Sequence, residues 1–121
     1  MTIKIATLNS RGGDSKTLHI IKTLQDHKID ICCIQESHDI SYENICKIEN
    51  LNNYKVFKCP GSSNGRGVLT IIRETICKKA KMINKDNEGN YLVVELDVQN
   101  EILEIVNVYG PMTPTSRAKL F

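Results

Sequence analysis

The chain has 121 residues, of which 40% are hydrophobic and 25% are charged. This composition is typical of a folded globular domain and excludes collagen-like repeats, low-complexity sequence and a disulfide-rich scaffold. Lysine and arginine number 16 against 14 aspartates and glutamates, so the net charge of +2 is compatible with a polyanionic partner without indicating one.

The five cysteines bear on the cellular environment. Their number is odd and no Cys-x-x-Cys spacing occurs, which argues against a zinc knuckle and against a redox pair. We therefore expect reduced, buried thiols in an intracellular protein of the cytoplasm or the nucleus. The sequence begins with a strand-like pattern instead of a signal peptide. Apolar runs such as Ile31 to Ile34 are too short to cross a bilayer, so no membrane partner is expected.

Two strand-like segments open the chain. Ile3 to Asn9 combines alternation with β-branched residues, which predicts a strand. Ile29 to Gln35 is a nearly continuous apolar run, as in a central strand that is buried on both faces. A helix-like segment separates them, and strand, helix and strand in this order predict a strand–crossover–strand unit.

Two helices are expected in this first half. The first is predicted to run from a cap at Asp14 or Ser15 to about His27. Its buried face is expected to consist of Leu18, Ile21 and Leu24. Ser41 can cap a second, short helix that ends near Asn50.

The second half has the pattern of an antiparallel meander. Strands are expected at Tyr54 to Lys58, Val68 to Arg73, Lys81 to Asn84, Tyr91 to Val98 and Ile102 to Tyr109. Pro60 to Gly67 predicts a loop, and Asp86 to Asn90 predicts a hairpin turn in which Gly89 has a positive φ. Thr113 followed by Pro114 is typical of a helix start. Together these elements predict an α/β fold with a mixed, largely antiparallel sheet flanked by helices.

Two polar side chains stand where the first two strands end. Glu36 follows the buried strand, and ligands of α/β sheets bind at the carboxyl ends of strands. A carboxylate there can hold Mg²⁺ together with waters and phosphate oxygens. Asn9 would lie beside it if the strands are neighbours. The alternatives are a solvent-exposed glutamate that ends a strand and a turn-forming asparagine satisfied by its own loop.

Three further side chains are candidates at the same edge. The phenol of Tyr109, at the end of the last strand, can donate to a phosphate oxygen, and its alternative is a packed tyrosine at the sheet edge. Arg66 and the backbone of its glycine-rich loop could bind a phosphate, although the loop is not a P-loop and could be plain and flexible. His38 lies close to Glu36 and could reach a site or remain a solvated loop residue.

Four motifs occur in an order and spacing that resemble one family. They are Asn9 at the end of the first strand, QESH at 35–38, GRGVLTI at 65–71 and NVYGP at 107–111. Together they resemble the endonuclease/exonuclease/phosphatase superfamily, which includes AP-endonuclease-like proteins. The segments 8–12, 35–38 and 109–121 look most like the endonuclease domain of non-LTR (LINE-type) retrotransposons.

The resemblance implies a four-layered α/β sandwich whose two halves each contribute a sheet, and phosphoester cleavage with Mg²⁺ or Mn²⁺. It implies that Glu36 is a metal ligand, that Asn9 supports the metal and the phosphate, and that Tyr109 contacts the scissile phosphate; these three are the expected catalytic residues. Phosphate or substrate binding is implied for Arg11, His38, Arg66 and Asn107.

Two motifs of the family are not in this sequence: a Gly-Asp-x-Asn segment, whose aspartate would activate water, and a Ser-Asp-His-like segment. We therefore expect residues 1–121 to be the N-terminal half of the domain, truncated after the Tyr-Gly-Pro strand, with the inner face of its sheet uncovered. The missing C-terminal half would be needed for a complete site.

The predicted function is that of a Mg²⁺-dependent DNA-nicking endonuclease of retroelement type, of which this chain is an inactive or weakly active part. DNA and a reverse transcriptase domain in the same polyprotein are the implied partners. The alternatives are a phosphatase or phosphodiesterase of the same superfamily and a non-catalytic remnant that acts as a binding module.

Overall fold

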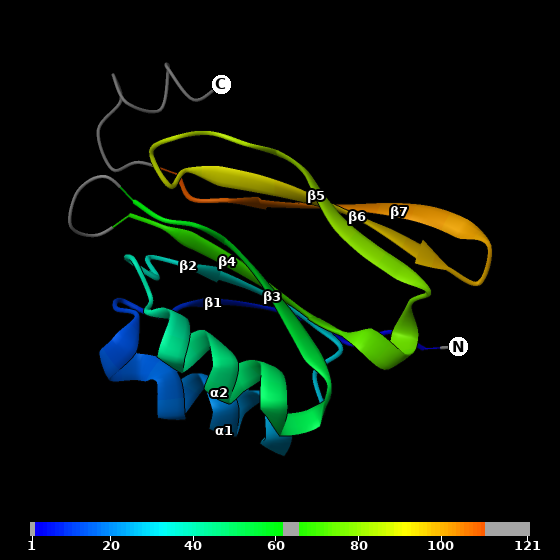
Figure 1. The fold of residues 1–121 in the computed structure, drawn as a ribbon, viewed down its shortest axis with the longest axis horizontal. Helices are drawn as coiled ribbons and strands as arrows, with labels where there is room; N and C mark the ends of the chain where they lie inside the picture. The colour runs from blue at the N-terminus through cyan, green and yellow to red at the C-terminus, as the bar shows by residue number, and fades with distance from the viewer. Residues whose placement is uncertain (1, 62–65, 111–121) are drawn as a thin grey trace.

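The computed structural model describes residues 2–61 and 66–110, which form three stacked layers (Figure 1). Two sheets pack face to face, and two helices cover the outer face of one of them. The elements are β1 (Ile5–Asn9), the 3₁₀ turn η1 (Asp14–Lys16), α1 (Thr17–Asp26), β2 (Ile31–Gln35), α2 (Tyr42–Asn52), β3 (Tyr54–Cys59), β4 (Val68–Arg73), the 3₁₀ turn η2 (Glu74–Ile76), β5 (Lys79–Lys85), β6 (Tyr91–Val98) and β7 (Glu101–Val108). The sheets have the strand orders β1-β2-β4-β3 and β5-β6-β7.

The strand–crossover–strand prediction is confirmed. β1 and β2 are parallel neighbours joined through α1, and Asn9 lies opposite Gln35 in their register. Every other strand pair is antiparallel, as expected for the meander. The cap of α2 is also as predicted, because the Ser41 hydroxyl accepts from the backbone N–H of Asn44 at 3.3 Å. The hairpin turn 86–90 contains Gly89 at a φ of 77°.

The start of α1 differs from the prediction. Residues 14–16 form a 3₁₀ turn, so the α-helix begins at Thr17 and presents a different face to the sheet. Thr17, Ile20 and Leu24 are buried, Ile21 packs partly against the core, and Leu18 is 79% exposed. The predicted burial of Leu18 is therefore wrong.

The predicted cap at Asp14 or Ser15 is also wrong, because neither side chain caps α1. The Asp14 carboxylate instead accepts from the Ser41 N–H and from the Asn44 Nδ2, both at 2.8 Å. Asp14 therefore ties the entrance of α1 to the first turn of α2. These hydrogen bonds, led by that from the Ser41 N–H, hold the pKa of the Asp14 carboxyl below its usual value.

Each interface between layers has its own apolar core. The core between the helices and the four-stranded sheet contains Ile20, Leu24, Ile29, Cys32, Ile34, Ile40, Ile45, Ile48, Tyr54, Leu69 and Ile71. The core between the two sheets contains Ile31, Cys59, Val68, Ile72, Leu92, Val94, Leu96 and Val98. β2 and β4 are buried on both faces and contribute to both cores, which explains their almost unbroken apolar sequences.

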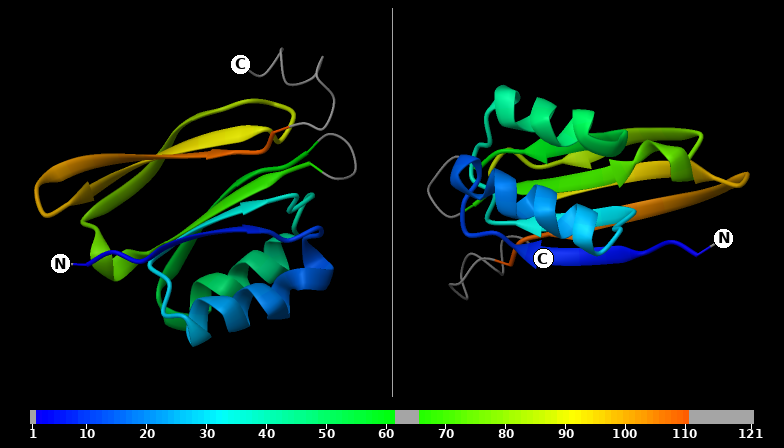
Figure 2. Two further views of the ribbon diagram at one scale, coloured as in Figure 1. Left: turned by 180° about the vertical axis from the view of Figure 1, so that it is seen from behind. Right: turned by 90° about the horizontal axis from the view of Figure 1, so that it is seen from below.

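Two expectations about the sheets are corrected. The inner face of the four-stranded sheet is not uncovered, because β5, β6 and β7 pack on it (Figure 2). The chain also supplies strands to both sheets, so one half of the domain does not correspond to one sheet. Among residues 2–61 and 66–110, no element packs on the outer face of the three-stranded sheet. This face exposes Ile102 at 60%, Val106 at 57% and Val108 at 36%.

Two further expectations concern membrane-spanning helices and the segments outside the described residues. None of the helices within 2–61 and 66–110 is long and apolar enough to span a membrane. The predicted helix start at Thr113 and Pro114 lies outside the described residues, as do residues 62–65 of the glycine-rich loop.

All five cysteines are free thiols, which is the state expected from their number and spacing. Cys32, Cys33 and Cys59 are buried, and burial raises the pKa of the Cys32 thiol to about 12 and also raises that of Cys33. Because the thiolate is the reactive form, we expect these three to resist alkylation in the native chain, whereas Cys46 and Cys77 are modified first. Mass spectrometry after timed iodoacetamide treatment measures this order, and early labelling of Cys32 would contradict the buried placement.

Candidate active site at the strand ends

The candidate site lies at the edge of the sheet where β1 and β2 end. The backbone N–H of Ser10 donates to the Gln35 carbonyl at 3.0 Å, and that of Gly12 donates to the Glu36 carbonyl at 2.8 Å. These bonds continue the β1–β2 pairing beyond the strands. Asn9 is the last residue of β1, and Glu36 directly follows the last residue of β2. The two residues therefore stand at the same edge of the sheet, as expected if the strands pair.

Three of the seven described non-glycine residues with a positive φ lie at this edge, and the other four lie in turns elsewhere. Arg11, Glu36 and His38 have φ values of 52°, 55° and 55°, in the left-handed region that costs a residue with a side chain about 1–3 kcal/mol. Neighbouring backbone holds these conformations. The N–H of Ser37 donates to the Gly67 carbonyl at 3.0 Å, and the N–H of His38 donates to the Arg66 carbonyl at 2.7 Å. The β3–β4 loop therefore fixes the segment that carries Glu36.

Tyr109 reaches Glu36 from the other sheet. Its backbone N–H donates to the Asn90 carbonyl at 2.6 Å, just beyond the end of β7. Its phenol lies near the Glu36 carboxylate. Burial, followed by the negative charge of Glu36, raises the pKa of Tyr109, and the nearby Arg66 acts in the opposite direction. The phenol therefore stays protonated and available as a donor.

Asn9 and Arg11 are exposed on the β1 side of the site. The Asn9 Oδ1 accepts from the Arg11 N–H at 3.2 Å, so this oxygen forms the local turn that we considered as the alternative to a site role. An amide oxygen has a second lone pair, so the turn still leaves Asn9 able to bind a cation or a water. His38 is half-buried next to Glu36.

Asn107 does not lie in the site as expected. Its side chain is 1% exposed and lies between the two sheets. The Nδ2 donates to the Leu69 carbonyl at 2.7 Å and contacts the Ile34 carbonyl and the Thr70 hydroxyl at 3.3 Å, while the Oδ1 accepts from the Gln35 Nε2 at 2.9 Å. A buried amide with these partners cannot bind a phosphate directly. It instead orients Gln35, next to Glu36.

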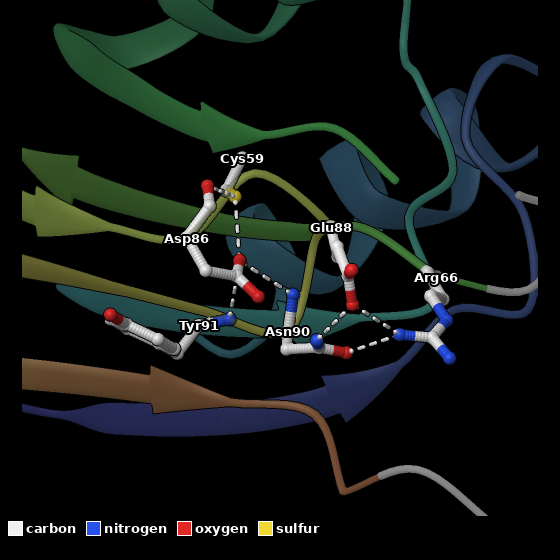
Figure 3. Close-up of polar contacts among 6 residues, drawn as sticks. All are labelled: Cys59, Arg66, Asp86, Glu88, Asn90 and Tyr91. Carbon is white, nitrogen blue, oxygen red and sulfur yellow. Dashed lines mark hydrogen bonds and ion pairs between the residues drawn. The ribbon is translucent and has the colours of Figure 1, made fainter. Parts of the chain in front are cut away.

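Arg66 contacts Asn90 and Glu88, two residues of the predicted hairpin turn 86–90 (Figure 3). Its Nη1 donates to the Asn90 Oδ1 at 3.0 Å and pairs with the Glu88 carboxylate at 3.4 Å. Asp86 fixes the same loop by accepting from the backbone N–H groups of Asn90 and Tyr91 at 3.0 and 3.4 Å. The contact between Arg66 and Asn90 spans 24 residues and depends on how the loops meet, so spacing along the chain gave no signal for it.

Close backbone packing brings these loops together at Gly89. A Cβ at Gly89 would lie 2.6 Å from the Gly61 Cα and from the Gly67 nitrogen, and the residue has a φ of 77°. We expect Gly89→Ala to destabilise the fold by at least about 2 kcal/mol through backbone strain and overpacking. Urea unfolding measures this. Asn87→Ala in the same turn is the control, and equal stabilities of the two variants would contradict the packing described.

The described residues contain no group of three or more histidine, cysteine or acidic side chains that could enclose a metal ion. Glu36 supplies one carboxylate and Asn9 supplies an amide oxygen from the adjacent strand end. This donor set fits Mg²⁺, which commonly uses one or two carboxylates and keeps several waters. It does not fit a metal ion whose ligands all come from the protein.

A comparison of the sequence with protein families identifies the chain. The profile of the Endonuclease/Exonuclease/phosphatase family matches residues 6–118. The chain belongs to this family. The predicted superfamily is thereby confirmed, and the α/β layers described above are those of a member of the Endonuclease/Exonuclease/phosphatase family.

Solved structures share the fold. The AP endonuclease LMAP from Leishmania major superposes with a TM-score of 0.70 at 20% identity over 97% of this chain and 43% of that protein. The 3′ phosphatase NExo from Neisseria, solved with a product DNA hairpin, gives 0.69 at 17% identity over 98% and 48%. A truncated TDP2 from Caenorhabditis elegans gives 0.69 at 16% identity over 96% and 49%. The chain thus spans about half the length of these relatives.

Proposed function

We propose that this chain carries the metal-binding part of a divalent-metal-dependent phosphodiesterase that acts on DNA. The observation that carries the proposal is the placement of Glu36. Glu36 directly follows the end of β2, beside the end of the parallel β1, and its backbone has a left-handed conformation; its carboxylate lies near the phenol of Tyr109 from the other sheet. Strain that neighbouring backbone maintains is characteristic of functional sites.

The residues at this edge suit a phosphate diester. In the proposed site Glu36 and Asn9 would hold Mg²⁺ or Mn²⁺, and the bound ion would supply Lewis-acid stabilisation of charge on a phosphate. The Tyr109 phenol is a neutral donor that can move from Glu36 to a phosphate oxygen. Arg66, Arg11 and His38 provide further donors around it. DNA as the substrate is supported by the relatives solved with a DNA hairpin and with a single-stranded DNA product.

We propose that the 121-residue chain alone cleaves DNA weakly or not at all. The expected water-activating Gly-Asp-x-Asn segment and the Ser-Asp-His-like segment are not in its sequence. Nicking of supercoiled plasmid in the presence of Mg²⁺ tests this part of the proposal. Robust nicking that Glu36→Ala abolishes would overturn the expected inactivity while supporting the assignment of Glu36.

Binding of Mn²⁺ tests the metal site without requiring turnover. A paramagnetic ion broadens the nuclear magnetic resonance signals of nearby nuclei, so we expect selective broadening at residues 9–12 and 36–38 of the isotope-labelled chain. Prior addition of excess Mg²⁺ should reduce the broadening. Broadening centred on another acidic segment would contradict the proposed metal site.

A phosphatase is the second candidate, favoured by the relative described as a 3′ phosphatase. A protein in which the family's downstream motifs follow this chain would distinguish the two functions. Turnover of a DNA phosphodiester faster than that of a DNA 3′-phosphate supports the endonuclease, and the reverse supports the phosphatase. A non-catalytic binding module would bind DNA or metal without either activity.

We also propose a retroelement origin, with a reverse transcriptase domain in the same polyprotein and an intracellular location. The sequence at 8–12, 35–38 and 109–121 supports the origin, and the free thiols support the location. Reading the coding sequence downstream of Phe121 tests the origin. A Gly-Asp-x-Asn motif, a Ser-Asp-His motif and then a reverse transcriptase are expected there.

A further inference from the structure

We propose that Asn90 is a positioning residue whose side chain holds the Arg66 guanidinium at the edge of the sheet that carries Glu36, and so presents Arg66 to a substrate phosphate. The phosphate contact rests on the proposed function, whereas the positioning of Arg66 does not. Nothing in the sequence motifs of the family resemblance points to Asn90, which lies in the hairpin turn between β5 and β6.

Four polar groups of Asn90 have partners in the structure. Its backbone N–H donates to the Asp86 carboxylate at 3.0 Å, and its carbonyl accepts from the Tyr109 N–H at 2.6 Å. Its Oδ1 accepts from the Arg66 Nη1 at 3.0 Å, and its Nδ2 contacts the Glu88 Oε2 at 3.5 Å. The residue is 6% exposed. A buried amide with this many contacts has one orientation, with its oxygen toward the guanidinium (Figure 3).

These contacts join two separate segments of the site. Arg66 belongs to the β3–β4 loop, and its backbone carbonyl also accepts from the His38 N–H. Tyr109 follows the end of β7. The Tyr109 phenol in turn lies near the Glu36 carboxylate. The Asn90 side chain therefore fixes the cationic donor, while its backbone continues the β6–β7 pairing that carries the phenolic donor. Two such donors beside a metal ligand match the need to neutralise charge on a phosphate.

The competing explanation is that Arg66 is held by its ion pair with Glu88. The Glu88 side chain is 65% exposed, and its distance to Arg66 is 3.4 Å. Exposed ion pairs of this kind contribute little and are screened by salt. The two explanations predict opposite results. If Asn90 positions Arg66, removing the Glu88 carboxylate takes away a competing anion but leaves the guanidinium in place. Removing the Asn90 side chain makes the guanidinium mobile.

The mobility of the Arg66 side chain tests the positioning directly. In the isotope-labelled chain, the Nε–Hε group of Arg66 should relax as a rigid group in the wild type and in Glu88→Gln, and as a mobile group in Asn90→Ala. Asn90→Asp is nearly isosteric and keeps the oxygen acceptor, so Arg66 should stay rigid in it. It also serves as the informative variant if Asn90→Ala does not fold. A rigid Arg66 in Asn90→Ala, or a mobile one in both Asn90→Asp and Glu88→Gln, would overturn the proposal.

A double-mutant cycle tests the phosphate contact. The probe is a single-stranded DNA of about 12 nucleotides, within the length that such sites cover. We expect Arg66→Gln to weaken binding about tenfold, which is the usual loss for a hydrogen bond to a charged group. Asn90→Ala should weaken it by a similar factor, and the double variant should bind no more weakly than Arg66→Gln. Glu88→Gln should bind DNA at least as tightly as the wild type.

The outcomes separate this inference from the proposed function. Additive losses in the double variant would show that Asn90 does not act through Arg66, and they would overturn the inference while leaving DNA binding intact. A wild-type chain that binds no DNA would overturn both the phosphate contact and the choice of DNA as partner. The relaxation of Arg66 in the absence of DNA would still decide whether Asn90 positions it.

Discussion

Glu36→Gln is expected to weaken the binding of Mn²⁺ to the chain by at least about tenfold, because the amide removes the one carboxylate of the proposed site. The substitution keeps the shape of the side chain and an oxygen that can accept from the Tyr109 phenol, so the fold should not change. The measurement is the Mn²⁺-induced broadening of the signals of residues 9–12 as a function of ion concentration. In a longer protein that cleaves DNA, the same substitution should abolish turnover.

Glu88→Gln is the matched control for Glu36→Gln. It removes a carboxylate from the same end of the molecule, and its side chain is 65% exposed. It should leave Mn²⁺ binding at the strand ends unchanged. If both variants lose affinity equally, the ion responds to the general negative charge of this region, and Glu36 is not the ligand that we propose.

Asn107→Leu is expected to destabilise the fold by about 3 kcal/mol, because the Leu69 carbonyl and the Gln35 amide each lose a hydrogen bond between the sheets without gaining water. Leucine is similar in volume, so the loss should not come from a cavity. Urea unfolding measures the change. Val106→Thr, on the neighbouring exposed position of β7, should alter stability by less than about 0.5 kcal/mol.

The position of Gln35 gives Asn107→Leu a second expected effect. Asn107 accepts from the Gln35 Nε2, and Gln35 directly precedes Glu36. Loss of this bond should shift the backbone signals of residues 35–37 and weaken Mn²⁺ binding less than Glu36→Gln does. Unchanged stability in Asn107→Leu would contradict the role of this amide between the sheets.

The elements of the fold could largely be predicted, because their burial follows simple periods. Residues 91–98 of β6 alternate strictly between inner and outer faces, and β2 and β4 are apolar because helices and a second sheet cover them. The face of α1 was predicted incorrectly because a 3₁₀ turn precedes it. That turn forms where Asp14 bonds to residues of α2, which is a tertiary contact that no local pattern contains.

The candidate site could be predicted only where it follows from strand ends. Glu36 and Asn9 are adjacent because parallel neighbours end at one edge. The family motif predicts that Asn107 binds phosphate. In the alternation of β7, however, Asn107 lies on the same face as the inward-facing Leu103 and Ile105. This alternation is the sequence signal that indicates a buried amide. Asn90 was missed because its contact with Arg66 exists only once both loops are packed together.

The bond between Gln35 and Asn107 also has a consequence for the order of folding. It joins residues 72 positions apart, whereas the unit from β1 to β2 is local and can form early. Tyr109 comes near Glu36, and Asn90 contacts Arg66, only after the second sheet has docked on the first. The cluster around Glu36 should therefore be completed late, and a partly folded chain with an intact β1–α1–β2 unit should lack the Tyr109 and Arg66 contacts. Hydrogen exchange of the Gly67 N–H, which donates to the Gly89 carbonyl at 3.0 Å, should then report the docking of the second sheet, whereas the N–H groups of Ser37 and His38 report pairing with the β3–β4 loop.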